Sequence, residues 1–134
     1  MTKFEIRIND EIRMTNETGK FDLEERTASF GEQIIGFAKR IRVTPVNMPL
    51  ISQLVRAATS VGANYCEAND ACSKKDFRHK IGICRKEAKE SKHWLRMVAA
   101  AEDELRGDSR KLWQEAKELN MIFSAILRKR EHAV

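Results

Sequence analysis

The chain has 134 residues, of which 42% are hydrophobic and 34% charged, with six glycines and two prolines. These values exclude collagen-like, low-complexity and wholly disordered chains, and the length predicts one domain. Twenty-five basic residues against 20 acidic ones give a net charge of +5, which permits an acidic partner but is also common on ordinary surfaces. No segment approaches the roughly 20 apolar residues of a membrane span, so we expect neither secretion nor membrane insertion.

Residues 1–20 contain four basic and four acidic residues, and we expect a flexible arm there. Asp22 followed by Glu25 is a typical helix start, and hydrophobic residues then recur every three or four positions. This pattern predicts a first helix to about Arg42, ending ahead of Pro45. Its core positions are Phe30, Ile34, Phe37, Ala38 and Ile41.

A second helix is predicted by Asn47 as cap and Pro49 in the first turn, and it ends near Asn69. Its core positions are Leu50, Leu54, Ala58, Val61 and Tyr65. Few charges and many small residues predict a helix covered on nearly all sides, and Gly62 predicts close approach of another backbone. A polar file within about 60° of arc fits either a subunit or helix interface or a direct ligand contact. The file consists of Gln53, Ser60, Asn64 and Glu67.

A third helix begins at the capping signature of Ser73 and Asp76. We expect it to run to about Leu105, with Gly107 as its C-terminal cap. A strict heptad file forms its core face. The file consists of Phe77, Ile81, Cys84, Ala88, Ser91, Leu95 and Val98.

The fourth helix is predicted to start at Asp108 or Ser109 and to end at about Arg130, ahead of a short tail, residues 131–134. Its core positions are Leu112, Ala116, Leu119, Ile122, Phe123 and Ile126. Loops of about three to six residues make neighbouring helices antiparallel, which predicts an all-α up-down-up-down bundle over residues 21–130. The heptad spacing of the third helix predicts left-handed crossing.

Eight basic residues of the third helix fall within an arc of roughly 120° that contains no acidic residue before Asp103. Residues 1–68 sum to zero charge, so the excess arises after Asn69. The face is either an ordinary solvated surface or a ridge for nucleic-acid phosphates, without the aromatic platform that base recognition uses. The eight residues are Lys74, Lys75, Arg78, Arg85, Lys86, Lys89, Lys92 and Arg96.

Apolar residues on the opposite side of this helix widen the hydrophobic arc beyond what one bundle core needs. They are Ile83, Trp94, Met97 and Ala101. One interpretation is a large core that also accommodates Trp113. The other is contact with a second subunit.

Signatures of catalysis and metal binding are weak. Glu90 and His93 form one ExxH step, whereas di-iron bundles need two such steps and two further carboxylates. Cys66, Cys72 and Cys84 have no zinc-ligand spacing with the histidines and form no CxxC pair, which favours a reducing, cytoplasmic compartment. No Gly-rich phosphate loop or GxSxG motif is present in the sequence. We therefore expect no enzymatic activity, metal or other cofactor.

Several segments carry a resemblance to a known family: Phe21–Thr27, Gln53–Ala68, Ser73–Phe77 and Lys86–Glu90. Over about residues 21–128 the chain resembles the four-helix-bundle proteins encoded within intervening sequences of bacterial 23S rRNA genes. The resemblance implies an antiparallel four-helix bundle that assembles into a ring-shaped homopentamer. The same architecture occurs in the accessory variability proteins of diversity-generating retroelements, which bind a reverse transcriptase and nucleic acid, and this likeness concerns the fold alone.

The leading prediction is therefore a non-enzymatic homopentamer whose basic face binds RNA or DNA backbone without strong sequence specificity. Subunit contacts are expected from the second helix around Gly62 and from the Trp94 side of the third helix. The alternative is a protein-interaction adaptor, for example an accessory subunit of a nucleic-acid enzyme such as a reverse transcriptase.

Overall fold

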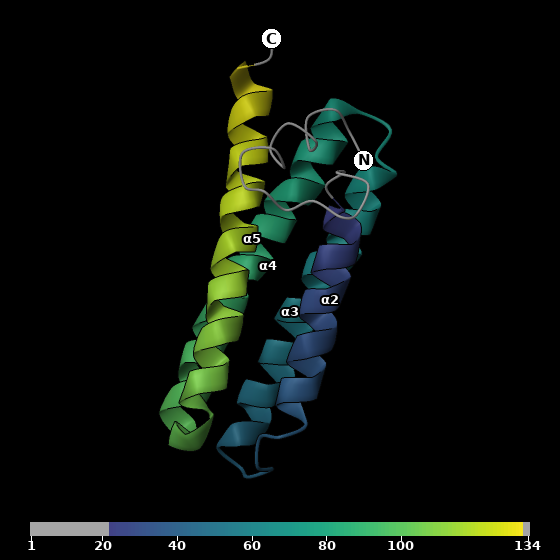
Figure 1. Ribbon diagram of the computed structural model, residues 1–134. Helices are drawn as coiled ribbons and strands as arrows, with labels where there is room; N and C mark the ends of the chain where they lie inside the picture. Colours follow the sequence, from purple (N-terminus) through teal and green to yellow (C-terminus); the bar gives the residue numbers. More distant parts are fainter. Residues whose placement is uncertain (1–21, 133–134) are drawn as a thin grey trace.

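A computed structural model describes residues 22–132, with side chains placed through Lys129. Four long helices lie side by side with nearly parallel axes (Figure 1), and no strand occurs within the described residues. The helices are α2 (Leu23–Ala38), α3 (Asn47–Asn69), α4 (Lys74–Ala101) and α5 (Arg106–His132). A short 3₁₀ helix, η1 (Asp103–Leu105), joins α4 to α5. The all-α prediction is confirmed, and the predicted arm, residues 1–20, lies outside the described part.

The core occupies the space between the helices at the positions that the hydrophobic spacing predicts. All seven residues of the heptad file on α4 are buried, including Ser91, whose hydroxyl donates to the carbonyl of Glu87 at 2.8 Å. Tyr65 of α3 and Phe123 of α5 pack with ring centroids 6.4 Å apart, within the range of favourable aromatic pairs. Burial raises the pKa of the Cys84 thiol to about 12, as expected for a cysteine that serves as a small core residue.

The first helix ends earlier than predicted. The Asp22 carboxylate accepts from the backbone N–H of Glu25 at 2.9 Å, which confirms the predicted start. Helix α2 stops at Ala38, however, because the chain tightens into two 3₁₀-type turns, closed by hydrogen bonds from Arg40 to Phe37 and from Ile41 to Ala38. Ile41 thereby stays in the core, at 3% exposure, although it lies outside the helix.

Asn47 is not the cap of α3, contrary to the prediction. It is the first helical residue, and its backbone N–H donates to the hydroxyl of Thr44 at 3.0 Å. The buried Asn47 side chain instead donates to the carbonyl of Arg42 at 3.0 Å and so fixes the connection between α2 and α3. Pro49 lies in the first turn of α3 and Asn69 ends the helix, both as predicted.

The junction between α4 and α5 also differs from the prediction. Ser73 caps α4, and its hydroxyl accepts from the N–H of Asp76 at 3.0 Å, but the helix ends at Ala101. Glu102 takes an extended conformation and pairs with Arg42 at 2.7 Å, so the chain leaves the helix ahead of Leu105. The predicted caps Gly107, Asp108 and Ser109 therefore all lie inside the first turns of α5.

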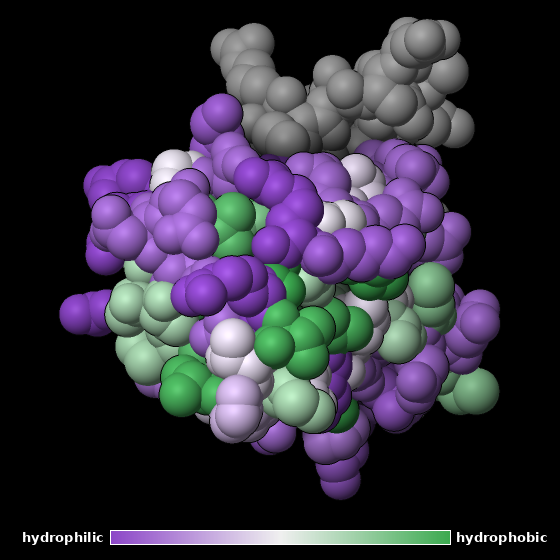
Figure 2. All heavy atoms as spheres, turned by 90° about the horizontal axis from the view of Figure 1, so that it is seen from below, coloured by the Kyte–Doolittle hydropathy of each residue, from purple (hydrophilic) through white to green (hydrophobic). Residues whose placement is uncertain are grey.

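Helix α3 packs against both α2 and α4, and α4 packs against both α3 and α5, whereas α2 meets α5 over a shorter stretch. The end of the bundle with the α2–α3 connection carries hydrophobic side chains among hydrophilic ones (Figure 2). Val43 and Val46 of this connection are 78% and 69% exposed, and Met48 in the first turn of α3 is 57% exposed. This end of the bundle therefore exposes hydrophobic side chains.

Candidate nucleic-acid interface

The predicted basic face lies on the surface of α4. Arg78 and Lys92 are half-buried, and the other six residues of the face are exposed. Arg78 donates to the backbone carbonyl of Leu127 on α5 at 2.9 Å. Among the described residues, no carboxylate forms an ion pair with the remaining seven side chains of the face. Their positive charge is therefore available to a bound anion.

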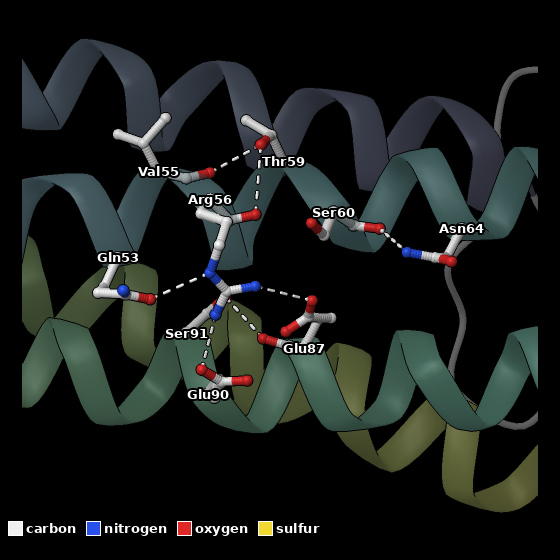
Figure 3. Close-up of polar contacts among 9 residues, drawn as sticks. All are labelled: Gln53, Val55, Arg56, Thr59, Ser60, Asn64, Glu87, Glu90 and Ser91. Atoms are coloured by element: carbon white, nitrogen blue, oxygen red, sulfur yellow. Dashed lines mark hydrogen bonds and ion pairs between the residues drawn. The ribbon is translucent and has the colours of Figure 1, made fainter.

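Two acidic residues of α4, Glu87 and Glu90, point away from this face toward α3. The guanidinium of Arg56 donates to Glu87 at 3.0 Å and to Glu90 at 2.7 Å, while its Nε donates to the side-chain oxygen of Gln53 (Figure 3). Glu87 is buried and Glu90 half-buried, so this cluster neutralises both carboxylates at the α3–α4 contact. Charge is thus segregated across α4, with Glu87 and Glu90 paired on one side and seven basic residues without described carboxylate partners on the other.

Helix α5 extends the basic face across a second helix. Asn120 donates to the carbonyl of Arg85 at 2.9 Å, so α5 lies directly along the basic side of α4. Trp113 of α5 is half-buried there, with the ammonium of Lys92 at 5.3 Å and that of Lys117 at 5.7 Å from its ring centroid. Both distances are within the range of cation–π attraction.

A cleft of about 340 Å³ opens between the C-terminal half of α4 and the start of α5. Its walls carry Arg96 from α4 and Arg106, Arg110 and Trp113 from α5, and its floor consists of Leu95, Ala99 and Ser109. The Ser109 hydroxyl donates to the carbonyl of Leu95 at 2.7 Å and fixes the spacing of the two helices. Ala99 and Ser109 are small, and three arginines and one tryptophan line the same recess.

The α5 contribution was missed in the sequence, where Trp113 is considered only as part of a large core, and the structure does pack it partly against that core. A signal was present: Arg106, Arg110, Trp113 and Lys117 recur at intervals of three and four residues, which places them on one face of a helix. A predicted cap at Asp108 or Ser109 hides this pattern, because it leaves Arg106 outside the helix. In the structure, an aromatic residue, Trp113, therefore lies beside the basic face, where the prediction places none.

The predicted polar file does not form a single network. Asn64 donates to the carbonyl of Ser60 in its own helix at 2.9 Å, and Gln53 accepts from Arg56 (Figure 3). Glu67 is exposed and pairs with Lys80 of α4 at 2.7 Å. The file thus makes local contacts on α3 and between α3 and α4.

The residues predicted to contact another subunit lie at or near the surface. Ile83, Trp94 and Met97 are half-buried, and the Trp94 indole N–H is buried without an acceptor among the described residues. His93 packs edge-on against Trp94 with ring centroids 4.9 Å apart. Gly62 faces Thr27 of the same chain, and a Cβ at Gly62 would lie 3.4 Å from the carbonyl carbon of Thr27.

Within the described residues, no group of three or more His, Cys, Asp or Glu side chains lies close enough together to hold a metal ion. In the same part of the chain, no helix has the length and apolar character of a membrane span.

Comparison with known proteins identifies the family of this chain. The model of the family described as 23S rRNA-intervening sequence protein matches residues 20–125. A solved structure from Bacteroides thetaiotaomicron, described as a protein of unknown function from the S23 ribosomal protein family, is 28% identical, with a TM-score of 0.69. The match covers 79% of this chain and 98% of that one. No curated protein matches significantly. The chain therefore belongs to the 23S rRNA-intervening sequence protein family.

Proposed function

We propose that the protein is a non-enzymatic, pentameric bundle that binds the backbone of RNA or DNA through the basic face of α4, without strong sequence specificity. The observation that carries this proposal is the row of exposed bases that lack carboxylate partners in the described part of the chain. From Lys74 to Arg96 the row extends for about 33 Å, at 1.5 Å per residue. This length is close to one turn of duplex DNA, so several phosphates can contact one subunit.

Phosphate binding by such a face is driven largely by counterion release. Each neutralised phosphate frees condensed cations, so affinity falls steeply as salt rises. Lysine and arginine side chains that already pair with carboxylates would first have to break those pairs. On α4 the carboxylates of Glu87 and Glu90 accept hydrogen bonds from Arg56, so they do not compete with phosphates for the basic face.

Assembly would strengthen binding by repetition. In the proposed assembly, each subunit is an up-down-up-down, left-handed bundle, and five of them form a ring. The half-buried Ile83, Trp94 and Met97, on the side of α4 away from the bases, support subunit contact there. Five copies of the basic face could then act on one long strand by avidity.

Fluorescence anisotropy with a generic RNA at two salt concentrations tests the proposal. The double variant Lys86→Gln/Lys89→Gln removes two exposed charges of the face, and Lys39→Gln/Lys111→Gln removes two exposed charges away from it as a matched control. We expect the first variant to lower the slope of log affinity against log salt by about 1.4, for two contacts at about 0.7 each. Absence of binding at low salt, or an equal loss in both variants, would refute the proposal.

A second candidate function, a protein-interaction adaptor for a nucleic-acid enzyme, is favoured by the exposed Val43, Val46 and Met48 at the end of the bundle. Pull-down after nuclease treatment separates the two functions. A partner retained after nuclease supports the adaptor, and it should be lost when Val43 and Val46 are replaced by serine. A partner lost with the RNA was tethered only through nucleic acid.

A further inference from the structure

We propose that the cleft between α4 and α5 holds one unpaired nucleotide, with its base against Trp113 and its phosphate between Arg96 and Arg110. This inference rests on the proposed nucleic-acid function and deepens it, because it names single-stranded nucleic acid as the preferred class of ligand. It also adds a local site to what would otherwise be a purely electrostatic surface.

The first support is the chemistry of the cleft walls. No carboxylate lines the cleft. Arg106 already donates to Asp103 at 3.1 Å and to the carbonyl of Ala99 at 3.4 Å. Arg96 and Arg110 are exposed and form no ion pair with a described carboxylate. Two guanidinium groups beside one recess suit a phosphate, which accepts paired hydrogen bonds from each of them.

The second support is the position of Trp113. Trp113 lines the cleft, whereas Lys92 and Lys117, whose ammonium groups lie near its ring, do not. An aromatic side chain beside cationic groups is the arrangement that holds single-stranded nucleic acids, because unstacked bases pack on the ring while the bases of a duplex are already stacked.

The third support is size. At about 340 Å³ the cleft is near the lower limit of small-molecule sites, which is roughly 300 Å³. That space suits one base with its sugar and not a base pair. Its floor is held by the hydrogen bond from Ser109 to Leu95, so the recess does not depend on a bound ligand to separate the helices.

Intrinsic fluorescence tests the cleft directly. The chain has two tryptophans, so the variant Trp94→Phe leaves Trp113 as the only reporter. We expect adenosine monophosphate to quench this emission, adenosine to bind more weakly, and inorganic phosphate alone to leave the emission unchanged. Arg110→Gln should remove the advantage of adenosine monophosphate over adenosine. Equal effects of phosphate and the nucleotide would overturn the proposed contact with the base.

A strand comparison separates this inference from the proposed function. The probes are an oligoadenylate RNA and the same strand annealed to its complement, measured with Trp113→Leu and with Trp113→Phe as the conservative control. We expect Trp113→Leu to weaken single-strand binding roughly tenfold or more, Trp113→Phe to keep most of the affinity, and duplex binding to stay unchanged. Salt-dependent binding that is equal for both probes and unaffected by Trp113→Leu would overturn the cleft proposal and leave backbone binding intact. Absence of binding to either probe would overturn both.

Discussion

Arg26 forms ion pairs between α2 and α5, and its replacement gives a quantitative prediction. Arg26 donates to both carboxylate oxygens of Glu115 at 2.7 Å each, and to Glu118 at 3.3 Å. The Arg26 side chain is 10% exposed and that of Glu115 is 25% exposed. Arg26→Met keeps most of the aliphatic volume but leaves Glu115 without its cation. We therefore expect a loss that reflects mainly the unpaired carboxylate.

The magnitude follows from the burial of the pair. Removing one partner of a fully buried pair costs about 3–5 kcal/mol, whereas exposed pairs contribute about 0–1 kcal/mol. A bidentate pair with this partial exposure lies between, so we expect the free energy of unfolding to fall by about 2–3 kcal/mol. Arg40 pairs with Asp108 at 2.8 Å with side chains 55% and 46% exposed, so Arg40→Met is the matched control at about 1 kcal/mol or less.

Urea unfolding followed by far-UV circular dichroism, at one protein concentration, measures both variants. Matched concentrations are required because assembly would make apparent stability depend on protein concentration. The double variant Arg26→Met/Glu115→Gln should recover part of the loss, since it removes the unpaired charge as well. A loss in Arg26→Met no greater than in Arg40→Met, or no recovery in the double variant, would refute the assignment of this stability to the pair.

Three further predictions concern single positions. Gly62→Ala should leave the free energy of unfolding unchanged or raise it by up to about 1 kcal/mol, because its Cβ would make ordinary contact with Thr27 and alanine favours helix. Gly62→Leu should lower the free energy of unfolding by about 1–3 kcal/mol. Urea unfolding measures both variants. The hydrogen bonds from Arg42 lower the pKa of Glu102 from 4.5 to about 2. The stability contributed by this carboxylate is therefore complete above pH 4.5 and is lost as the pH falls through 2. Over that pH window, the Tm of the native protein should fall more steeply than the Tm of Glu102→Gln. Cys84, with its pKa raised to about 12, should resist alkylation in the folded protein and react in urea, as read by mass spectrometry.

Each of these predictions has a contrary result. Equal destabilisation by alanine and leucine at Gly62 would show that even one methyl group is too much for the contact with α2. Parallel Tm profiles for the native protein and Glu102→Gln would remove the pair with Arg42 as a source of acid sensitivity. Alkylation of Cys84 in the folded protein as fast as that of the exposed Cys72 would show that the core opens to solvent.

Hydrophobic spacing predicts the core of this bundle well because burial depends mainly on which face of a helix a residue occupies. The file from Phe77 to Val98 is buried throughout, and Asp22 and Ser73 cap their helices as predicted. Helix ends that depend on distant residues were predicted less well. Glu102 leaves the helix where it meets Arg42, 60 positions earlier in the chain, and a local pattern contains no information about that partner.

The candidate site was predicted only in part for the same reason. Segregated charge on α4 is visible on a helical wheel, because all eight residues belong to one helix. The recess at Arg96 and Trp113 is formed by two helices, and its depth depends on which small residues, Ala99 and Ser109, meet across the contact. Register between helices is a property of packing, which the periodicity of each helix leaves open.

The short contact of α2 with α5 has a consequence for the motions of the bundle. Helices α3, α4 and α5 form a continuous packed unit, whereas α2 rests mainly on α3. Local openings follow the least supported element, so amide hydrogens of α2 should exchange with solvent at a lower opening free energy than those of α4. Detachment of α2 would leave both helices of the basic face, and the recess between them, in place. The proposed binding surface is thus built on the part of the molecule that opens last.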